Sequence, residues 1–141
     1  MIRKKHHTKR RQTRRGAATV EFALIAPLMI MFTFGMIEIG RLLMVKNAAT
    51  QATREGARAA SLPTASDEAV ASRVQEELQL LSVNGAIIET TPTSIGSAGP
   101  GELISVRVRI NPNDVSWAPT FFPFQIPEIV AESTMRKEST Q

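Results

Sequence analysis

The sequence predicts an α+β protein with a single N-terminal transmembrane helix that extends past the membrane, a second helix and a small antiparallel sheet. Three observations support this prediction. An uncharged apolar stretch follows a basic N-terminus. A later segment, from Val70 to Leu81, repeats its apolar residues at helical spacing. Residues 102–110 alternate apolar and polar side chains, as a half-buried strand does.

The charges are divided between a basic tail and an acidic remainder. The chain has 141 residues, with 17 Lys and Arg against 13 Asp and Glu and a formal net charge of +4. Eight of the basic residues lie within the first 15 residues, which contain no acid. The rest of the chain holds nine basic residues and all 13 acids. This asymmetry points to a membrane or a nucleic acid as the partner of the tail.

Residues 17–37 are predicted to form the transmembrane helix. The segment from Phe22 to Ile37 is without charge, and Glu21 is the one charged residue between Ala17 and Ile37. As a helix the segment spans about 31 Å, which matches the ~30 Å hydrocarbon core of a bilayer. Pro27 is expected to bend it. The alternative, a buried core helix, would need more apolar material than the remaining chain supplies.

The excess of basic residues before the span predicts a cytoplasmic leader, residues 1–16, and an extracytoplasmic body. This orientation accounts for the tail without a nucleic-acid partner, and no aromatic residue interleaves the tail for base stacking. A cleaved secretory signal would have a shorter apolar region and a small-residue cleavage site close behind it. Arg14 and Arg15 could indicate twin-arginine export, but Gly16 and two alanines follow them instead of a bulky apolar pair.

Residues 38–61 are predicted to continue the helix beyond the membrane, until Leu62 and Pro63 end it. Two pairs at i,i+3 spacing, Glu38 with Arg41 and Glu55 with Arg58, would support it. Small residues recur every four positions and form a smooth stripe, at Ala48, Ala52, Gly56 and Ala60. The stripe could pack against the chain's own sheet or against a neighbouring helix.

Residues 62–141 are predicted to form a small α+β body. A capping box at Thr64 and Asp67 would open a helix that Asn84 and Gly85 close. Its apolar face would consist of Val70, Val74, Leu78 and Leu81. Residues 86–91, 102–110 and 128–136 are the candidate strands. Phe121, Phe122 and Phe124 lie on one loop, where they could cover the core or form an apolar contact patch.

Histidine and cysteine are missing from the predicted body. Both histidines, His6 and His7, lie in the leader, and the chain has no cysteine. General-base histidine, thiol chemistry, disulfides and the common zinc sites are therefore excluded from the body. No glycine-rich phosphate loop follows a strand. We therefore expect no catalytic residue, cofactor or metal, and no enzymatic activity.

The leader–span junction resembles the processing site of type IV prepilins, especially the Flp and Tad subgroup. In those proteins a basic leader ends in glycine, and glutamate stands fifth after the cleavage point with an aromatic residue next. Here Gly16 would end the leader, and Glu21 and Phe22 stand fifth and sixth from Ala17. Two further stretches resemble the TadE-like family of pseudopilins and pilus-assembly proteins; their motif residues are Gly35, Glu38, Gly40, Arg41, Arg54, Glu55 and Arg58.

The resemblance implies a pilin-like helix-plus-sheet fold, a bacterial inner-membrane location and a role in Tad pilus biogenesis and surface adhesion. The implied partners are the prepilin peptidase, other pilins or pseudopilins and the Tad secretion machinery. It implies cleavage after Gly16, with Glu21 then pairing with the new amine on Ala17 of a neighbouring subunit. Alternatively, Glu21 extends only to the headgroups. The body favours a minor pilin or assembly subunit; the alternative is an unprocessed membrane-anchored adaptor or scaffold.

Overall fold

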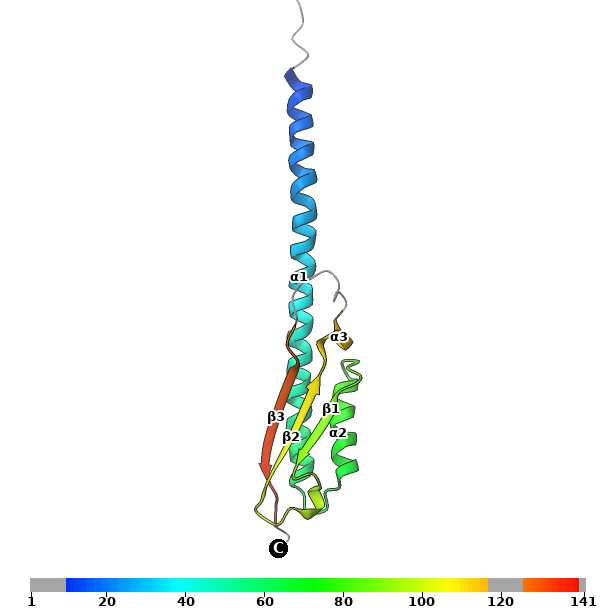
Figure 1. The fold of residues 1–141 in the computed structure, drawn as a ribbon, viewed down its shortest axis with the longest axis vertical. Coiled ribbons are helices and arrows are strands. Elements are labelled where there is room, and N and C mark those ends of the chain that lie inside the picture. The colour runs from blue at the N-terminus through cyan, green and yellow to red at the C-terminus, as the bar shows by residue number, and fades with distance from the viewer. Residues whose placement is uncertain (1–9, 117–125, 140–141) are drawn as a thin grey trace, which may run out of the picture. The chain divides into compact units, whose positions relative to one another are not determined.

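The computed structural model describes residues 10–116 and 126–139, with side chains from Gly16 onward (Figure 1). The chain divides into two compact units, Met1–Ile37 and Glu38–Gln141, and the first helix, α1 (Arg10–Ser61), contributes to both. The predicted Phe121, Phe122 and Phe124 loop lies outside the described residues.

The first unit contains the apolar part of α1. Its large side chains are exposed around the whole helix, as the 71 % exposure of Phe22 and the 73 % exposure of Leu24 illustrate. The helix continues through Pro27. By length and composition, the part of α1 from Gly16 to Ser61 qualifies as a membrane-spanning helix, and no other described helix does. A helix that is apolar on all sides and uncovered by protein is typical of a membrane anchor.

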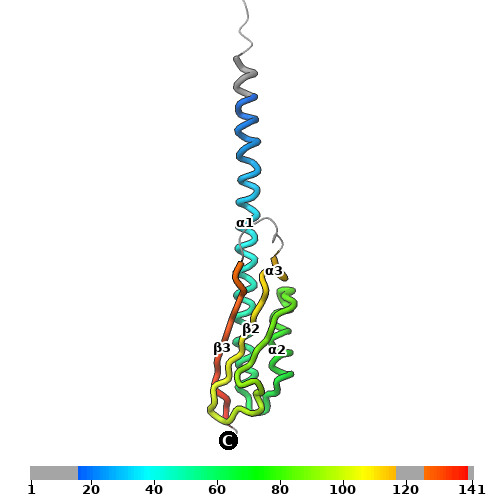
Figure 2. The backbone as a smooth tube through the Cα atoms, viewed as in Figure 1, coloured from blue at the N-terminus to red at the C-terminus, as the bar shows by residue number. Residues whose placement is uncertain are grey.

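The second unit pairs two helices with one sheet, which confirms the predicted α+β fold. The end of α1 is followed by α2 (Asp67–Gln79), β1 (Ile87–Thr91), the short 3₁₀ turn η1 (Ile95–Ser97), β2 (Leu103–Ile110), the short helix α3 (Pro112–Val115) and β3 (Ile129–Arg136). The strands are antiparallel in the order β1-β2-β3, so β2 is central (Figure 2). The three predicted strand segments therefore join one sheet.

The core lies between the sheet and the two helices. From β2, Ile104, Val106, Val108 and Ile110 are fully buried, because alternate residues of a strand face the same side. From α2 the core receives Val70, Val74 and Leu78. From α1 it receives mainly alanines, and Thr53 lies among them with its hydroxyl 3.1 Å from that of Ser133 on β3.

Two details of the predicted second helix are wrong. Ser66, not Thr64, is its N-cap, and its hydroxyl accepts a hydrogen bond from the Ala69 amide at 3.2 Å. The helix ends at Gln79 instead of Asn84, because the chain turns at Ser82 (φ 54°). Leu81 therefore leaves the helical face and is 45 % exposed. The helical repeat identified the element, but local backbone geometry determined both ends.

Gly56 is the position where α1 approaches the rest of the body most closely. A Cβ atom built there would overlap Cγ2 of Val74 and would lie 3.3 Å from Cγ1 of Val106. Glycine thus allows the α1 backbone to contact side chains of both α2 and β2. Gly40, on the same helix, has nothing within 4 Å of such an atom.

We predict opposite effects of alanine at these two glycines. Gly40→Ala should stabilise the chain, because glycine in a helix interior costs up to about 1 kcal/mol relative to alanine. Gly56→Ala gains the same helix propensity but overpacks the core, which typically costs about 1–3 kcal/mol. Denaturant unfolding of the full chain in detergent micelles should therefore place Gly56→Ala about 1–3 kcal/mol below Gly40→Ala. Equal stability of the two variants would contradict this packing.

Candidate functional site

The predicted processing residues lie on the exposed, helical N-terminal part of α1. Gly16, Ala17, Glu21 and Phe22 are all exposed. A Cβ atom at Gly16 would meet nothing within 4 Å, so packing within the chain does not require glycine there. Glycine is the weakest helix former after proline. Its presence makes local unwinding at Gly16 easier, and a protease needs such unwinding to reach a peptide bond in a helix.

Glu21 is an acidic side chain on an otherwise apolar surface. Within the described part of the chain no hydrogen bond or ion pair engages its carboxylate. The residues one helical turn away on either side, Ala17 and Ile25, cannot pair with a charge. A carboxylate at such a site is costly near hydrocarbon, so a cation or the headgroup region must accommodate it.

The second of the two TadE-like stretches, which holds Arg54, Glu55 and Arg58, lies where α1 packs against α2. Glu55 is 3.6 Å from Arg58 on its own helix and 3.8 Å from Arg73 on α2. Arg73 in turn contacts Glu77 at 3.2 Å. Arg54 is exposed, and the buried Gly56 separates these charges from the core. The polar residues of this stretch therefore border the close helix contact that the glycine permits.

The first of the two TadE-like stretches, which holds Gly35, Glu38, Gly40 and Arg41, contains a buried acid and an arginine that bonds a distant carbonyl. Glu38 is only 6 % exposed and its Oε1 atom has no hydrogen-bond partner. Arg41 donates through Nε to the carbonyl oxygen of Val115 at 2.5 Å. Arg41 thus joins α1 to the end of α3, 74 positions later in the chain. Gly35 is half-buried and Gly40 is exposed.

The stripe of small residues faces the interior of the body. Ala48 is 7 % exposed, Ala52 and Ala60 are fully buried, and Gly56 is buried as well. Of the two possibilities that the sequence left open, the structure places the stripe against the chain's own core. It is therefore unavailable to a neighbouring helix unless the body opens.

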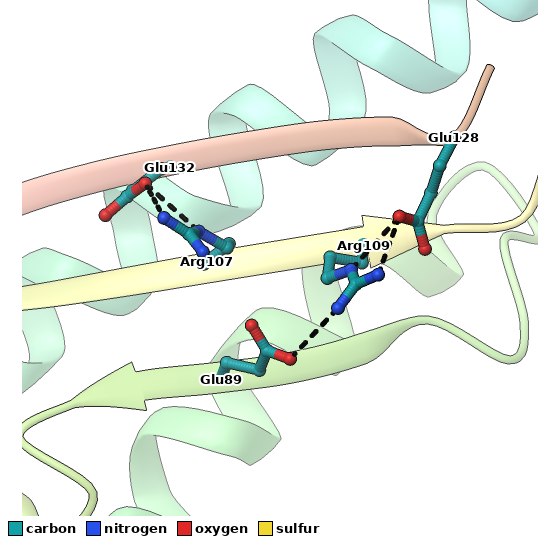
Figure 3. A network of polar contacts seen from close by, with 5 residues as sticks. All are labelled: Glu89, Arg107, Arg109, Glu128 and Glu132. Carbon is teal, nitrogen blue, oxygen red and sulfur yellow. Dashed lines mark hydrogen bonds and ion pairs between the residues drawn. The ribbon is translucent and has the colours of Figure 1, made fainter.

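The outer face of the sheet carries an ion-pair network (Figure 3). Arg107 and Arg109 extend from β2. Arg107 contacts Glu132 at 2.7 Å, and Arg109 contacts Glu128 at 2.9 Å and Glu89 at 3.5 Å. The antiparallel register brings these charges together, since it sets Arg107 between Glu89 and Glu132. The sequence placed both arginines on this face but did not identify their partners.

Hydrogen bonds in this network shift the pKa of its members. The pKa of Glu132 is lowered, first by the hydrogen bond from the Ser105 hydroxyl and then by that from Arg107. The pKa of Arg107 is raised by the same Glu132, and that of Arg109 is raised mainly by Glu128. All these groups are exposed, so they define the charge pattern of the face more than its stability.

Two polar side chains that bond the η1 turn, Asp67 and Lys137, were not predicted from the sequence. The Ile95 amide donates to Oδ1 of Asp67 at 2.8 Å. The buried Lys137 ammonium donates to the carbonyls of Ile95 and Ala98, both at 2.9 Å. These bonds hold the fully buried Ile95 side chain in the core. They join residues 28 and 42 positions apart, and no local pattern signals them.

The described residues contain no cluster of metal-ligating side chains. Within residues 16–116 and 126–139, no group of three His, Asp or Glu side chains is arranged to hold a metal ion. One groove on the body is lined by Pro100, Gly101 and residues 136–139, and two others lie beside α1 with mostly apolar linings. The predicted processing, motif and helix-packing residues therefore lie on exposed surfaces or at helix contacts.

The structure is thus an exposed apolar helix that continues into a small helix-plus-sheet body, and the apolar helix suggests a membrane anchor. The model of the TadE-like protein family matches residues 16–58, which confirms the resemblance over this segment. The family suggests a protein associated with the Tad pilus, and it is a structural family. Comparisons with curated proteins and with solved structures find no match.

Because the pKa of Glu132 is lowered in the folded chain, its contribution to stability is present at neutral pH. It should be lost as the pH falls through the folded-state pKa. We predict that Glu132→Gln lowers the urea midpoint at about pH 7 and reduces the further loss between about pH 5 and pH 3. Glu68→Gln, at an exposed position without a described contact, should follow the wild-type pH curve. An unchanged acid loss in Glu132→Gln would contradict the role of Glu132.

Proposed function

We propose that this protein is a minor pilin or pseudopilin of a Tad/Flp-type pilus, and that prepilin peptidase cleaves it between Gly16 and Ala17. The observation that carries the proposal is that the family match begins at Gly16, the residue that would precede the cleaved bond. The basic residues before Gly16 and the exposed apolar helix after it support an inner-membrane anchor with a cytoplasmic leader and an extracytoplasmic body.

The body supports a minor or initiating subunit more than the bulk of a fibre. Residues 38–141 form a unit with its own core, built from two helices and three strands. Each copy in a fibre would have to accommodate this unit outside the helix. A subunit present in few copies, active in pilus biogenesis and surface adhesion, satisfies this requirement more easily. Its partners would be the peptidase, other pilins or pseudopilins and the Tad secretion machinery.

The first experiment determines the N-terminus. Processing would leave residues 17–141, so mass spectrometry of protein from bacterial membranes should find Ala17 as the first residue. Gly16→Leu should keep the leader, because a large side chain prevents close approach of the peptidase to the backbone. Gly40→Leu, at a second exposed glycine of α1, is the matched control and should be cleaved. An intact Met1 form in cells with active peptidase would favour the unprocessed adaptor or scaffold.

The role of Glu21 can be tested separately from cleavage. If its carboxylate pairs with the new amine of Ala17 on a neighbouring subunit, Glu21→Gln should leave membrane insertion and cleavage intact. It should also remove the protein from sheared pili, because the neutral amide forms no ion pair. Glu68→Gln is the control for loss of one carboxylate. Normal recovery of Glu21→Gln in the pilus fraction would show that Glu21 extends only to the headgroups.

A further inference from the structure

The sheet has two edges, and they differ in how far they are protected. β1 is five residues long and Pro92 follows it, so little of its backbone is open to another strand. β3 is eight residues long and lacks the features that usually blunt an edge: it contains no proline or lysine, and no bulge interrupts its register with β2. β2 lies on one side of β3, and the order β1-β2-β3 leaves the other side without a strand (Figure 1).

The backbone groups on the free side of β3 can be assigned from its hydrogen bonds. One residue past the end of β3, the Lys137 amide donates to the Glu102 carbonyl at 2.8 Å. In an antiparallel ladder the groups that face the neighbouring strand alternate along the chain. Counting back from Lys137, the odd-numbered residues of β3 bond β2, whereas Val130, Glu132 and Thr134 direct their amide and carbonyl groups away from it. Within the described part of the chain, no group bonds these outward amides.

An apolar groove with a volume of 340 Å³ lies beside the start of this edge. Its α1 wall consists of Ile39, Leu42, Leu43 and Lys46, and its other wall consists of residues 126–130. No residue of β2 lines the groove, so it lies on the free side of β3. Ile39 and Leu43 are each 57 % exposed. A strand added along β3 would turn alternate side chains toward α1, into this groove.

These observations favour an extended peptide over the other candidates for this edge. Lipid tails have no hydrogen-bonding groups, so they would leave the outward amides unpaired. Two copies in one membrane cannot pair their β3 edges antiparallel, because α1 runs alongside the strands of the body and the two α1 helices would then point in opposite directions (Figure 1). A strand of another protein supplies both main-chain partners for the edge and apolar side chains for the groove.

We propose that the free edge of β3 is a strand-addition site for an extended segment of another protein chain. The segment bonds the outward backbone groups of Val130, Glu132 and Thr134 and turns alternate apolar side chains into the groove beside α1. No new ion pair is required, since Glu132 keeps its partner Arg107 on the outer face of the sheet. The inference goes beyond the proposed function and requires neither cleavage nor a pilus.

Hydrogen exchange measures the edge directly. The probe is a synthetic peptide with the sequence of residues 102–110, because this strand already pairs with β3 and alternates apolar with polar side chains. In the full-length chain in detergent micelles, NMR should show rapid exchange at Val130, Glu132 and Thr134 and slow exchange at Ala131. Added peptide should slow the three outward amides about tenfold or more and leave Ala131 unchanged. A peptide of the same composition in scrambled order is the matched control and should protect none of them.

Proline substitution tests the role of the main chain. Thr134→Pro removes one outward amide, and proline is tolerated where the N–H of an edge strand faces solvent. The variant should bind the fluorescently labelled 102–110 peptide about tenfold more weakly, because one main-chain hydrogen bond is lost. Thr134→Val keeps the amide while losing the hydroxyl contact with Ser105, and it should bind as the wild type does. Val130→Pro is the second proline variant, and slow exchange at Val106 and Val108 shows that the sheet is folded in each.

Four results would overturn the inference. One is slow exchange of the outward amides in the free chain, which would show that the chain itself or a second copy already covers the edge. Another is failure of the peptide to bind although the sheet is folded. The third is binding that leaves the outward amides unprotected, as expected if the peptide only fills the groove or replaces β2. The fourth is binding by both proline variants that equals that of the wild type.

Discussion

The close contact of α1 with α2 and β2 at Gly56 is the constraint on which the rest of the body depends. Val74 and Val106 occupy the space that a side chain at Gly56 would need. The alanines on the same side of α1 contribute little volume, so the large core residues come from α2 and β2. A helix with a small-residue face can thus serve as the spine of a sheet domain while its opposite side remains available.

One helix therefore has two kinds of surface. Up to Ile37 its large apolar residues are exposed on every side, and from Glu38 onward its buried residues are mostly small. The first kind is favourable only in lipid or against other helices, because water would face a large apolar area. The small-residue face that begins after Glu38 is favourable only where the sheet and α2 cover it. The change between them divides the chain into an anchoring unit and a folded unit without interrupting the helix.

The sequence predicted those elements whose signal is local. The alternation at Ile104, Val106 and Val108 identified the central strand, and the apolar run identified the helix that is long and apolar enough to cross a membrane. The pairing of distant residues could not be predicted. Arg41 donates to Val115, and Lys137 to Ile95, across 74 and 42 positions. These contacts depend on strand register and loop closure, which i,i+3 patterns do not contain.

The ion pairs are likewise either local, as between Glu55 and Arg58, or between distant residues of the sheet. The charges that are already paired determine which surfaces can bind other chains. Arg107 and Arg109 pair with Glu89, Glu128 and Glu132 on the outer face of the sheet, so a partner there would have to compete with existing ion pairs. Association gains most where apolar area is buried and charges gain new partners without losing old ones. The outer face of the sheet fails the second condition, because its charges already have partners within the chain.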